Sequence, residues 1–119
     1  MKYSIVIPCY NEEKNLPDLI DSLKSFPEKY NVQFILVENG SADGSRNYMK
    51  SIEDQVMPKI QFVWVDQNQG YGYGIQQGLK VAEGDYVGWI HADMQMNPHD
   101  LTKFFDYLES YGKEEKLFL

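Results

Sequence analysis

His91, Asp93 and Gln95 stand at alternate positions in the segment GWIHADMQMNP, directly after an apolar run that reads as a strand. If the extended backbone continues through them, all three side chains project to the same side of the chain. One imidazole nitrogen and two oxygen donors form a candidate site for Mn²⁺ or Mg²⁺, which retain waters or substrate phosphates at their other positions. The imidazole favours Mn²⁺, whereas zinc requires more His or Cys ligands. The alternative is a polar loop that only caps the strand.

The segment PCYNEE, which follows the first apolar run, contains no glycine. The glycine-rich fingerprint of dinucleotide-binding folds is therefore absent where it must occur, which argues against an NAD site. Tyr10 instead offers an aromatic face, and Glu12 offers a carboxylate. Residues 11–15 equally read as the start of a helix with favourable acids in its first turn.

Two further polar segments follow the second and third apolar runs. In ENGSADGS, Glu38 and Asn39 can accept a hydrogen bond from a ring N–H, and Asn39 can also donate, which suits the edge of a nucleobase. The residues Asp43 to Ser45 are expected to cap the next helix. In NQGYGYG, glycines recur at 70, 72 and 74, although glycine costs about 1 kcal/mol in a helix. Either a ligand that presses on the backbone or a tight contact between helix and sheet would explain them.

The elements that must position these residues alternate along the chain. Runs rich in β-branched and aromatic residues predict strands over 3–8, 32–38, 60–65 and 86–90. Apolar residues at helical spacing predict helices over 16–26, capped by Asn15, over 45–56, over about 75–82, and from Asn97-Pro98 to Tyr111. This alternation predicts an α/β fold with a mainly parallel, Rossmann-like sheet, whose ligands bind outside the carboxyl ends of the strands. Residues 117–119 resemble the beginning of a fifth strand, so we expect a fragment of a larger domain.

Composition limits the classes of function. The chain has 119 residues, which we expect to form a single domain over 1–119, and 18 acids against 11 bases give a net charge of −7. Nucleic acid is excluded as a partner, because it binds clustered Lys and Arg, and an anionic small ligand would need a divalent cation. Cys9 can form no internal disulfide and is expected to be a small buried residue. The sequence contains no signal peptide and no membrane span, so we expect a cytoplasmic location, with any membrane association arising from segments outside this chain.

Taken together and in this order, IVIPCYNEE, ILVENGSADGS, NQGYGYGIQQGL and AEGDYVGWIHADMQMNP resemble the nucleotide-binding half of family 2 glycosyltransferases with the GT-A fold. The nearest branch is the polyprenyl-phosphate, or dolichol-phosphate mannose synthase, type, whose metal motif reads D-A-D-x-Q. The resemblance implies an inverting enzyme that transfers a sugar from a nucleoside diphosphate sugar with Mn²⁺ or Mg²⁺. It implies that Asp93 is the catalytic metal ligand, supported by Gln95. It also implies that Pro8, Tyr10, Glu12 and Glu38 bind the nucleotide. We add Asn39 and Gly70 to this nucleotide-binding set.

Two departures from the family pattern affect what is expected. Asn39 replaces the second of two acids, which leaves the choice of base open. His91 replaces the first Asp of the metal motif, so we expect weakened metal binding that falls below about pH 6.5 as the imidazole protonates. The family's general base and acceptor-side residues are expected beyond residue 119. The acceptor, polyprenyl phosphate or a glycan, and the oligomeric state also stay open.

Two other classes compete with the enzyme. A non-catalytic nucleotide-sugar-binding module would account for the altered metal motif. A phospho-receiver domain is also α/β and has an acidic pair after its first strand and a phosphorylatable Asp after its third, which Glu12-Glu13 and Asp66 superficially match.

Overall fold

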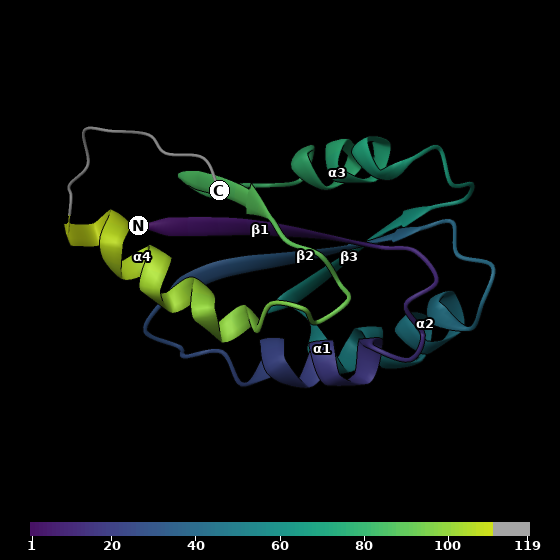
Figure 1. Ribbon diagram of the computed structural model, residues 1–119, viewed down its shortest axis with the longest axis horizontal. Helices are drawn as coiled ribbons and strands as arrows, with labels where there is room; N and C mark the ends of the chain where they lie inside the picture. Colours follow the sequence, from purple (N-terminus) through teal and green to yellow (C-terminus); the bar gives the residue numbers. More distant parts are fainter. Residues whose placement is uncertain (111–119) are drawn as a thin grey trace.

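The computed structural model describes residues 1–110, which form a four-stranded sheet with helices on both faces (Figure 1). The strands are β1 (Lys2–Cys9), β2 (Asn31–Asn39), β3 (Ile60–Val65) and β4 (Tyr86–Trp89). They pair in parallel in the order β3-β2-β1-β4. The predicted parallel α/β sheet is confirmed, and each predicted strand lies within one residue of its expected bounds.

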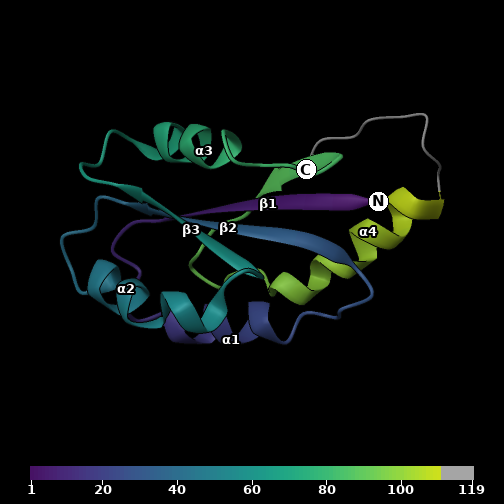
Figure 2. The same cartoon turned by 180° about the vertical axis from the view of Figure 1, so that it is seen from behind.

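The helices divide unequally between the faces of the sheet. Helices α1 (Leu16–Lys24), α2 (Ser45–Val56) and α4 (Leu101–Ser110) cover one face, and α3 (Tyr71–Leu79) lies alone on the other (Figures 1 and 2). A 3₁₀ turn, η1 (Pro98–Asp100), leads into α4. The side chain of Asn97 accepts a hydrogen bond from the backbone N–H of His99 at 3.0 Å, as its predicted capping role requires.

The central strands β1 and β2 are buried on both sides over most of their length, which explains their continuous apolar sequence. Ile5 and Ile7 of β1 belong to the larger core cluster, which includes residues of α1, α2 and α4. Val6, between them, points to the opposite face and belongs to a smaller cluster with Val37 of β2, against which Tyr73 of α3 packs. The sheet thus acts as a buried platform, and its polar functional groups are confined to the strand ends.

Helix α3 begins at Tyr71, earlier than the apolar spacing indicates, and ends at Leu79, before the expected residue 82; packing requires two of its glycines. A Cβ on Gly78 would overlap Cγ1 of Val6 and lie 3.0 Å from Cγ2 of Val37. A Cβ on Gly74 would lie 2.7 Å from Nδ2 of Asn39. At these two positions the tight contact between helix and sheet is the correct explanation, whereas Gly72 has open space around it.

The beginning and end of α1 also differ from expectation. Asn15 does not cap the helix: it has a helical backbone and makes no side-chain capping bond, and its Nδ2 donates instead to Oε2 of Glu12 at 2.7 Å. The helix ends at Lys24, before the expected Phe26. The predicted strand start at 117–119 and the predicted contribution of Tyr111 to α4 lie outside the described residues. Over residues 1–110, no helix combines the length and apolarity needed to cross a membrane.

Candidate functional site

A cavity of about 230 Å³ opens where the carboxyl ends of β1, β2 and β4 meet. Most of the predicted site residues line it, although they come from three separate loops. Tyr71 at the start of α3 and Ala92 also line it; both lie in segments expected at this edge of the sheet, but neither was predicted as a site residue. The complete lining consists of Pro8, Tyr10, Glu12, Asn39, Tyr71, His91, Ala92 and Asp93. The predicted residues Glu38, Gly70 and Gln95 do not line it.

The loops after β1 and β2 are joined to each other by hydrogen bonds, and we call residues 10–15 and 40–44 the paired loops. Oδ1 of Asn11 accepts from the backbone N–H of Ala42 at 2.8 Å. In the same direction, Oε1 of Glu13 accepts from the N–H of Gly44 at 3.0 Å, and in the reverse direction the N–H of Asn11 donates to Oγ of Ser41 at 3.0 Å. These polar residues therefore fix the loop geometry, which a sequence reading of either loop alone does not reveal.

Glu38 is committed to the protein rather than to the cavity. Its side chain is fully buried, with Oε1 accepting from the N–H of Ser41 and Oε2 accepting from Nε of Arg46, both at 2.8 Å. The hydrogen bond from Arg46 to Glu38 raises the pKa of the Arg46 guanidinium. The expectation that Glu38 faces a nucleobase needs correction, because both of its oxygens hold the loop and α2 in place. The sequence feature that could have indicated this ion pair is Arg46, the single arginine of the chain, which lies in the first turn of the helix after this loop.

Asn39 is a polar side chain at the cavity whose hydrogen bonding is incomplete. It is 1% exposed, and its Nδ2 donates to the backbone carbonyl of Gly70 at 3.1 Å. Its Oδ1 is buried and has no hydrogen-bond partner among residues 1–110. Buried polar atoms are nearly always paired, so this oxygen marks a position that favours a donor. Gly70 contributes indirectly, through the carbonyl that orients Asn39 and through the positive φ of 102° that begins α3.

The segment after β4 turns rather than continuing as a strand. Asp93 Oδ1 accepts from the N–H of Gln95 at 3.1 Å, and Met94 has a φ of 62°. The assumption of an extended backbone through residues 91–95 is therefore wrong, because this side-chain-to-backbone bond closes a turn. His91 and Asp93 still reach the cavity, but Gln95 does not. Within the described part of the chain, no group of three or more His, Cys, Asp or Glu side chains could hold a metal ion.

Three aromatic rings form one wall beside the cavity, and we call Tyr71, Trp89 and His91 the aromatic trio. The hydroxyl of Tyr71 is 2.9 Å from Nδ1 of His91, and their rings stack with centroids 5.4 Å apart. Trp89 makes T-shaped contacts with both rings, with its ring centroid 5.5 Å from that of Tyr71 and 5.3 Å from that of His91. Partial burial, with a smaller effect of the Asp93 charge, raises the pKa of the Tyr71 phenol, which therefore stays protonated at neutral pH.

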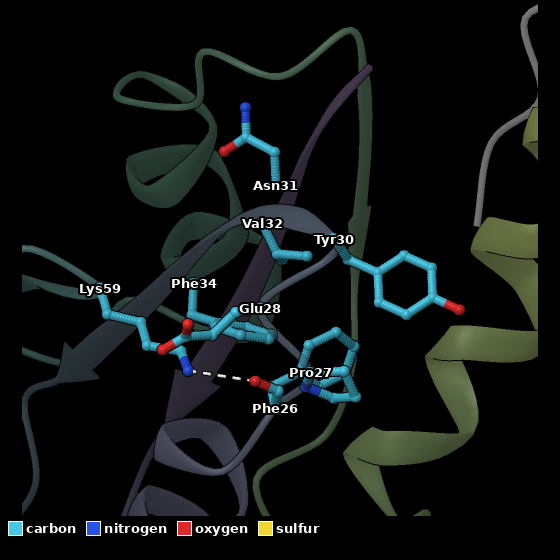
Figure 3. Close-up of a pocket in the computed structure, with 8 residues that line it drawn as sticks. All are labelled: Phe26, Pro27, Glu28, Tyr30, Asn31, Val32, Phe34 and Lys59. Carbon is cyan, nitrogen blue, oxygen red and sulfur yellow. Dashed lines mark hydrogen bonds between the residues drawn. The ribbon is translucent and has the colours of Figure 1, made fainter.

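A second and larger cavity, of about 340 Å³, lies at the amino edge of the sheet, beside the start of β2 (Figure 3). Lys59, which lines this cavity, donates from Nζ to the carbonyls of Lys24 and Phe26 at 2.8 and 3.2 Å. The ammonium of Lys59 therefore caps the carboxyl end of α1. Ligands of parallel α/β sheets bind at the opposite edge. We therefore assign the candidate site to the smaller cavity.

Several curated relatives of this chain share one name. The undecaprenyl-phosphate 4-deoxy-4-formamido-L-arabinose transferase of Proteus mirabilis is 32% identical over 106 residues, which cover 86% of this chain and 32% of that protein. The transferase of the same name from Serratia proteamaculans is 30% identical over 112 residues, covering 91% and 34%. The chain spans about a third of the length of these curated relatives. Their name is that of a polyprenyl-phosphate sugar transferase, the branch that the motifs resemble.

Solved structures give the same fold. S. aureus TarS in complex with UDP-GlcNAc matches with a TM-score of 0.74 and 25% identity, over 92% of this chain and 32% of that one. Glucosyl-3-phosphoglycerate synthase from Mycobacterium tuberculosis, in complex with Mn²⁺, UDP and glucosyl-3-phosphoglycerate, matches with a TM-score of 0.65 and 25% identity, over 92% and 38%. The model of the family described as Glycosyl transferase family 2 matches residues 4–114, nearly the whole chain. With the strand-end motifs gathered at the carboxyl edge of a parallel sheet, this match means that the chain belongs to glycosyl transferase family 2.

Proposed function

We propose that the chain forms the donor-binding side of an inverting, divalent-cation-dependent glycosyltransferase that transfers a sugar from a nucleoside diphosphate sugar to a polyprenyl phosphate. The observation that carries this proposal is the convergence of Tyr10, Asn39, His91 and Asp93 on one cavity from three strand ends. The names of the relatives support the lipid acceptor, and the UDP-GlcNAc and UDP in the related structures support the class of donor. A lipid acceptor would also require the protein to meet a membrane surface.

The hydrogen bonding of the Asn39 side chain supports recognition of a base that carries a ring N–H. One N–H of Nδ2 already donates to the carbonyl of Gly70, whereas Oδ1, which can only accept, has no partner among residues 1–110, so this position favours a ligand that donates. Uracil, thymine and guanine present a ring N–H, whereas the corresponding ring nitrogen of cytosine is an acceptor. Tyr10, which is 46% exposed at the cavity, offers an aromatic face against which the base can stack. We therefore expect UDP-, dTDP- or GDP-sugars to bind in preference to CDP-sugars.

His91 and Asp93 are the residues that would hold the cation. One imidazole and one carboxylate fit Mn²⁺ or Mg²⁺, which accept diphosphate oxygens and waters at their other positions. When bound, such a cation offsets the negative charge that develops on the leaving nucleoside diphosphate. The chain has a net charge of −7, and the residues among 1–110 that line the cavity include the acids Glu12 and Asp93 but no Lys or Arg, so these lining residues do not supply this charge.

The test is a thermal-shift panel of UDP-, dTDP-, GDP- and CDP-sugars against the 119-residue chain, with and without Mn²⁺. We expect at least one sugar nucleotide with a ring N–H to raise the melting temperature, and Mn²⁺ to increase the shift. Asp93→Asn should remove the increase due to Mn²⁺. Gly74→Ala should reduce the shift with or without Mn²⁺, because its new Cβ would displace the amide of Asn39. Absence of a shift with every nucleotide, or a Mn²⁺ effect that survives in Asp93→Asn, would contradict the proposal.

A non-catalytic nucleotide-sugar-binding module is the second candidate, and His91 favours it because the family motif has Asp there. The two candidates differ in turnover. Transfer of a radiolabelled sugar to undecaprenyl phosphate should be measured with this chain and with any longer protein that contains it. Donor binding without transfer in both would favour the binding module. The receiver hypothesis is removed by the family assignment.

A further inference from the structure

Tyr71 contacts His91 in a way that the family motif does not require. The phenol oxygen lies 2.9 Å from Nδ1, the two rings are nearly parallel at 23°, and Trp89 makes a T-shaped contact with the imidazole at an interplanar angle of 80°. The ring of His91 is therefore fixed by one hydrogen bond and two aromatic contacts. Tyr71 comes from α3, which is the helix that residues 1–110 place on this face of the sheet, so the position of α3 brings this group to the cavity.

The hydrogen bond leaves only one nitrogen of His91 available to a cation. A neutral imidazole carries one proton, and a metal binds the nitrogen that lacks it. If Nδ1 is protonated and donates to the phenol oxygen, Nε2 keeps its lone pair. Metal-binding histidines typically donate their second N–H to an oxygen acceptor, which selects the tautomer and orients the ring.

We propose that Tyr71 is a positioning residue that accepts the Nδ1 proton of His91 and so presents Nε2 to the divalent cation. This proposal rests on the proposed function, because it assumes a cation held by His91 and Asp93. A carboxylate at position 91, as in the family motif, has no tautomers and two equivalent oxygens, so it needs no such partner. Tyr71 thereby compensates for the replacement of Asp by His91 in this chain.

The partial exposure of Tyr71 supports this role. The side chain is 41% exposed, so its hydroxyl reaches the cavity while its ring is held by Trp89 and His91. The neutral phenol acts on the cation through the imidazole.

The experiment measures Mn²⁺ binding to the 119-residue chain by the loss of the free-ion EPR signal, with Mn²⁺ as the only ligand. Tyr71→Phe keeps the ring and removes the oxygen, and we expect affinity to fall about tenfold, as for other partners of metal-binding histidines. Tyr73→Phe is the matched control, because it removes a phenol oxygen from the same helix while its ring packs against the core cluster of Val6. This control should bind Mn²⁺ as the unchanged chain does.

His91→Asp supplies the background that separates positioning from general structural damage. In that variant Tyr71→Phe should change Mn²⁺ affinity less than twofold, since no imidazole is left to orient. Electron spin echo modulation of bound Mn²⁺ should show coupling to an imidazole nitrogen in the unchanged chain and none in His91→Asp. An equal loss on Tyr71→Phe in both backgrounds, or no loss in either, would overturn the proposal.

Asp93→Asn distinguishes failure of this inference from failure of the proposed function. If Asp93→Asn loses Mn²⁺ while Tyr71→Phe binds it normally, the cation site stands and the positioning role is wrong. If Asp93→Asn binds Mn²⁺ unchanged, the cation does not occupy this cavity, and both proposals are overturned.

Discussion

The glycines of α3 allow a stability prediction with an internal control. Gly78 is buried against β1 and β2, and a Cβ there would overlap Cγ1 of Val6, whereas a Cβ on Gly72 would meet no atom within 4 Å. Val6 is fully buried and β-branched, so its methyl groups cannot turn away easily. We predict that Gly78→Ala destabilises the protein and that Gly72→Ala stabilises it.

The magnitudes follow from two opposing effects. Both substitutions gain helix propensity, up to about 1 kcal/mol each, because alanine restricts the unfolded chain and suits a helix. Only Gly78→Ala adds the cost of overpacking, typically about 1–3 kcal/mol. Because the gain is similar in both variants, the difference between their unfolding free energies approximates the packing cost alone, about 1–3 kcal/mol.

Urea denaturation followed by circular dichroism measures this difference. The two variants should have similar m-values, since they expose the same surface on unfolding, and Gly78→Ala should unfold at lower urea concentration than the unchanged chain. Midpoints that place the two variants within about 0.5 kcal/mol of each other would refute the close packing of α3 on the sheet. The glycine at 78 would then need another explanation, such as contact with a ligand.

Two further predictions concern buried groups outside the cavity. Arg46→Met should destabilise the protein by about 2–4 kcal/mol in the same urea assay, because the fully buried Glu38 carboxylate loses its ion pair, and Arg46→Lys should have a stability between those of the unchanged chain and Arg46→Met. An effect of Arg46→Met below about 0.5 kcal/mol would show that the ion pair is not needed. Burial raises the pKa of the Cys9 thiol, so little thiolate forms at pH 8 and Cys9 should react with a thiol reagent only after denaturation; rapid labelling of the native protein would contradict its buried position.

The sequence was sufficient for the strands and for most of the cavity lining. Strands buried on both faces have unbroken apolar runs, and parallel strands place their carboxyl ends at one edge, so Tyr10, Asn39 and Asp93 could be grouped without coordinates. The start of α3 was predicted too late because of its glycines. Helix propensity counts the cost of Gly74 and Gly78 but not the packing that requires them.

The remaining site residues depend on contacts that local patterns do not encode. Glu38 was expected to face the nucleobase, but its ion pair with Arg46 forms only when the loop after β2 is folded. The extended geometry assumed for His91 to Gln95 is broken by a turn that Asp93 itself closes. Tyr71 joins His91 from a separate element, twenty residues away along the chain, so only the tertiary structure brings them together.

The hydrogen bonds within the paired loops have a consequence for molecular recognition. Asn11 and Glu13 of one loop are bonded to Ser41, Ala42 and Gly44 of the other, so neither segment can rearrange without the other. An incoming ligand therefore meets a surface whose shape is already set, and its association loses little conformational entropy in these segments. Selectivity at this rim then comes from complementarity to a rigid template, and a mutation that frees one segment would weaken binding chiefly through disorder.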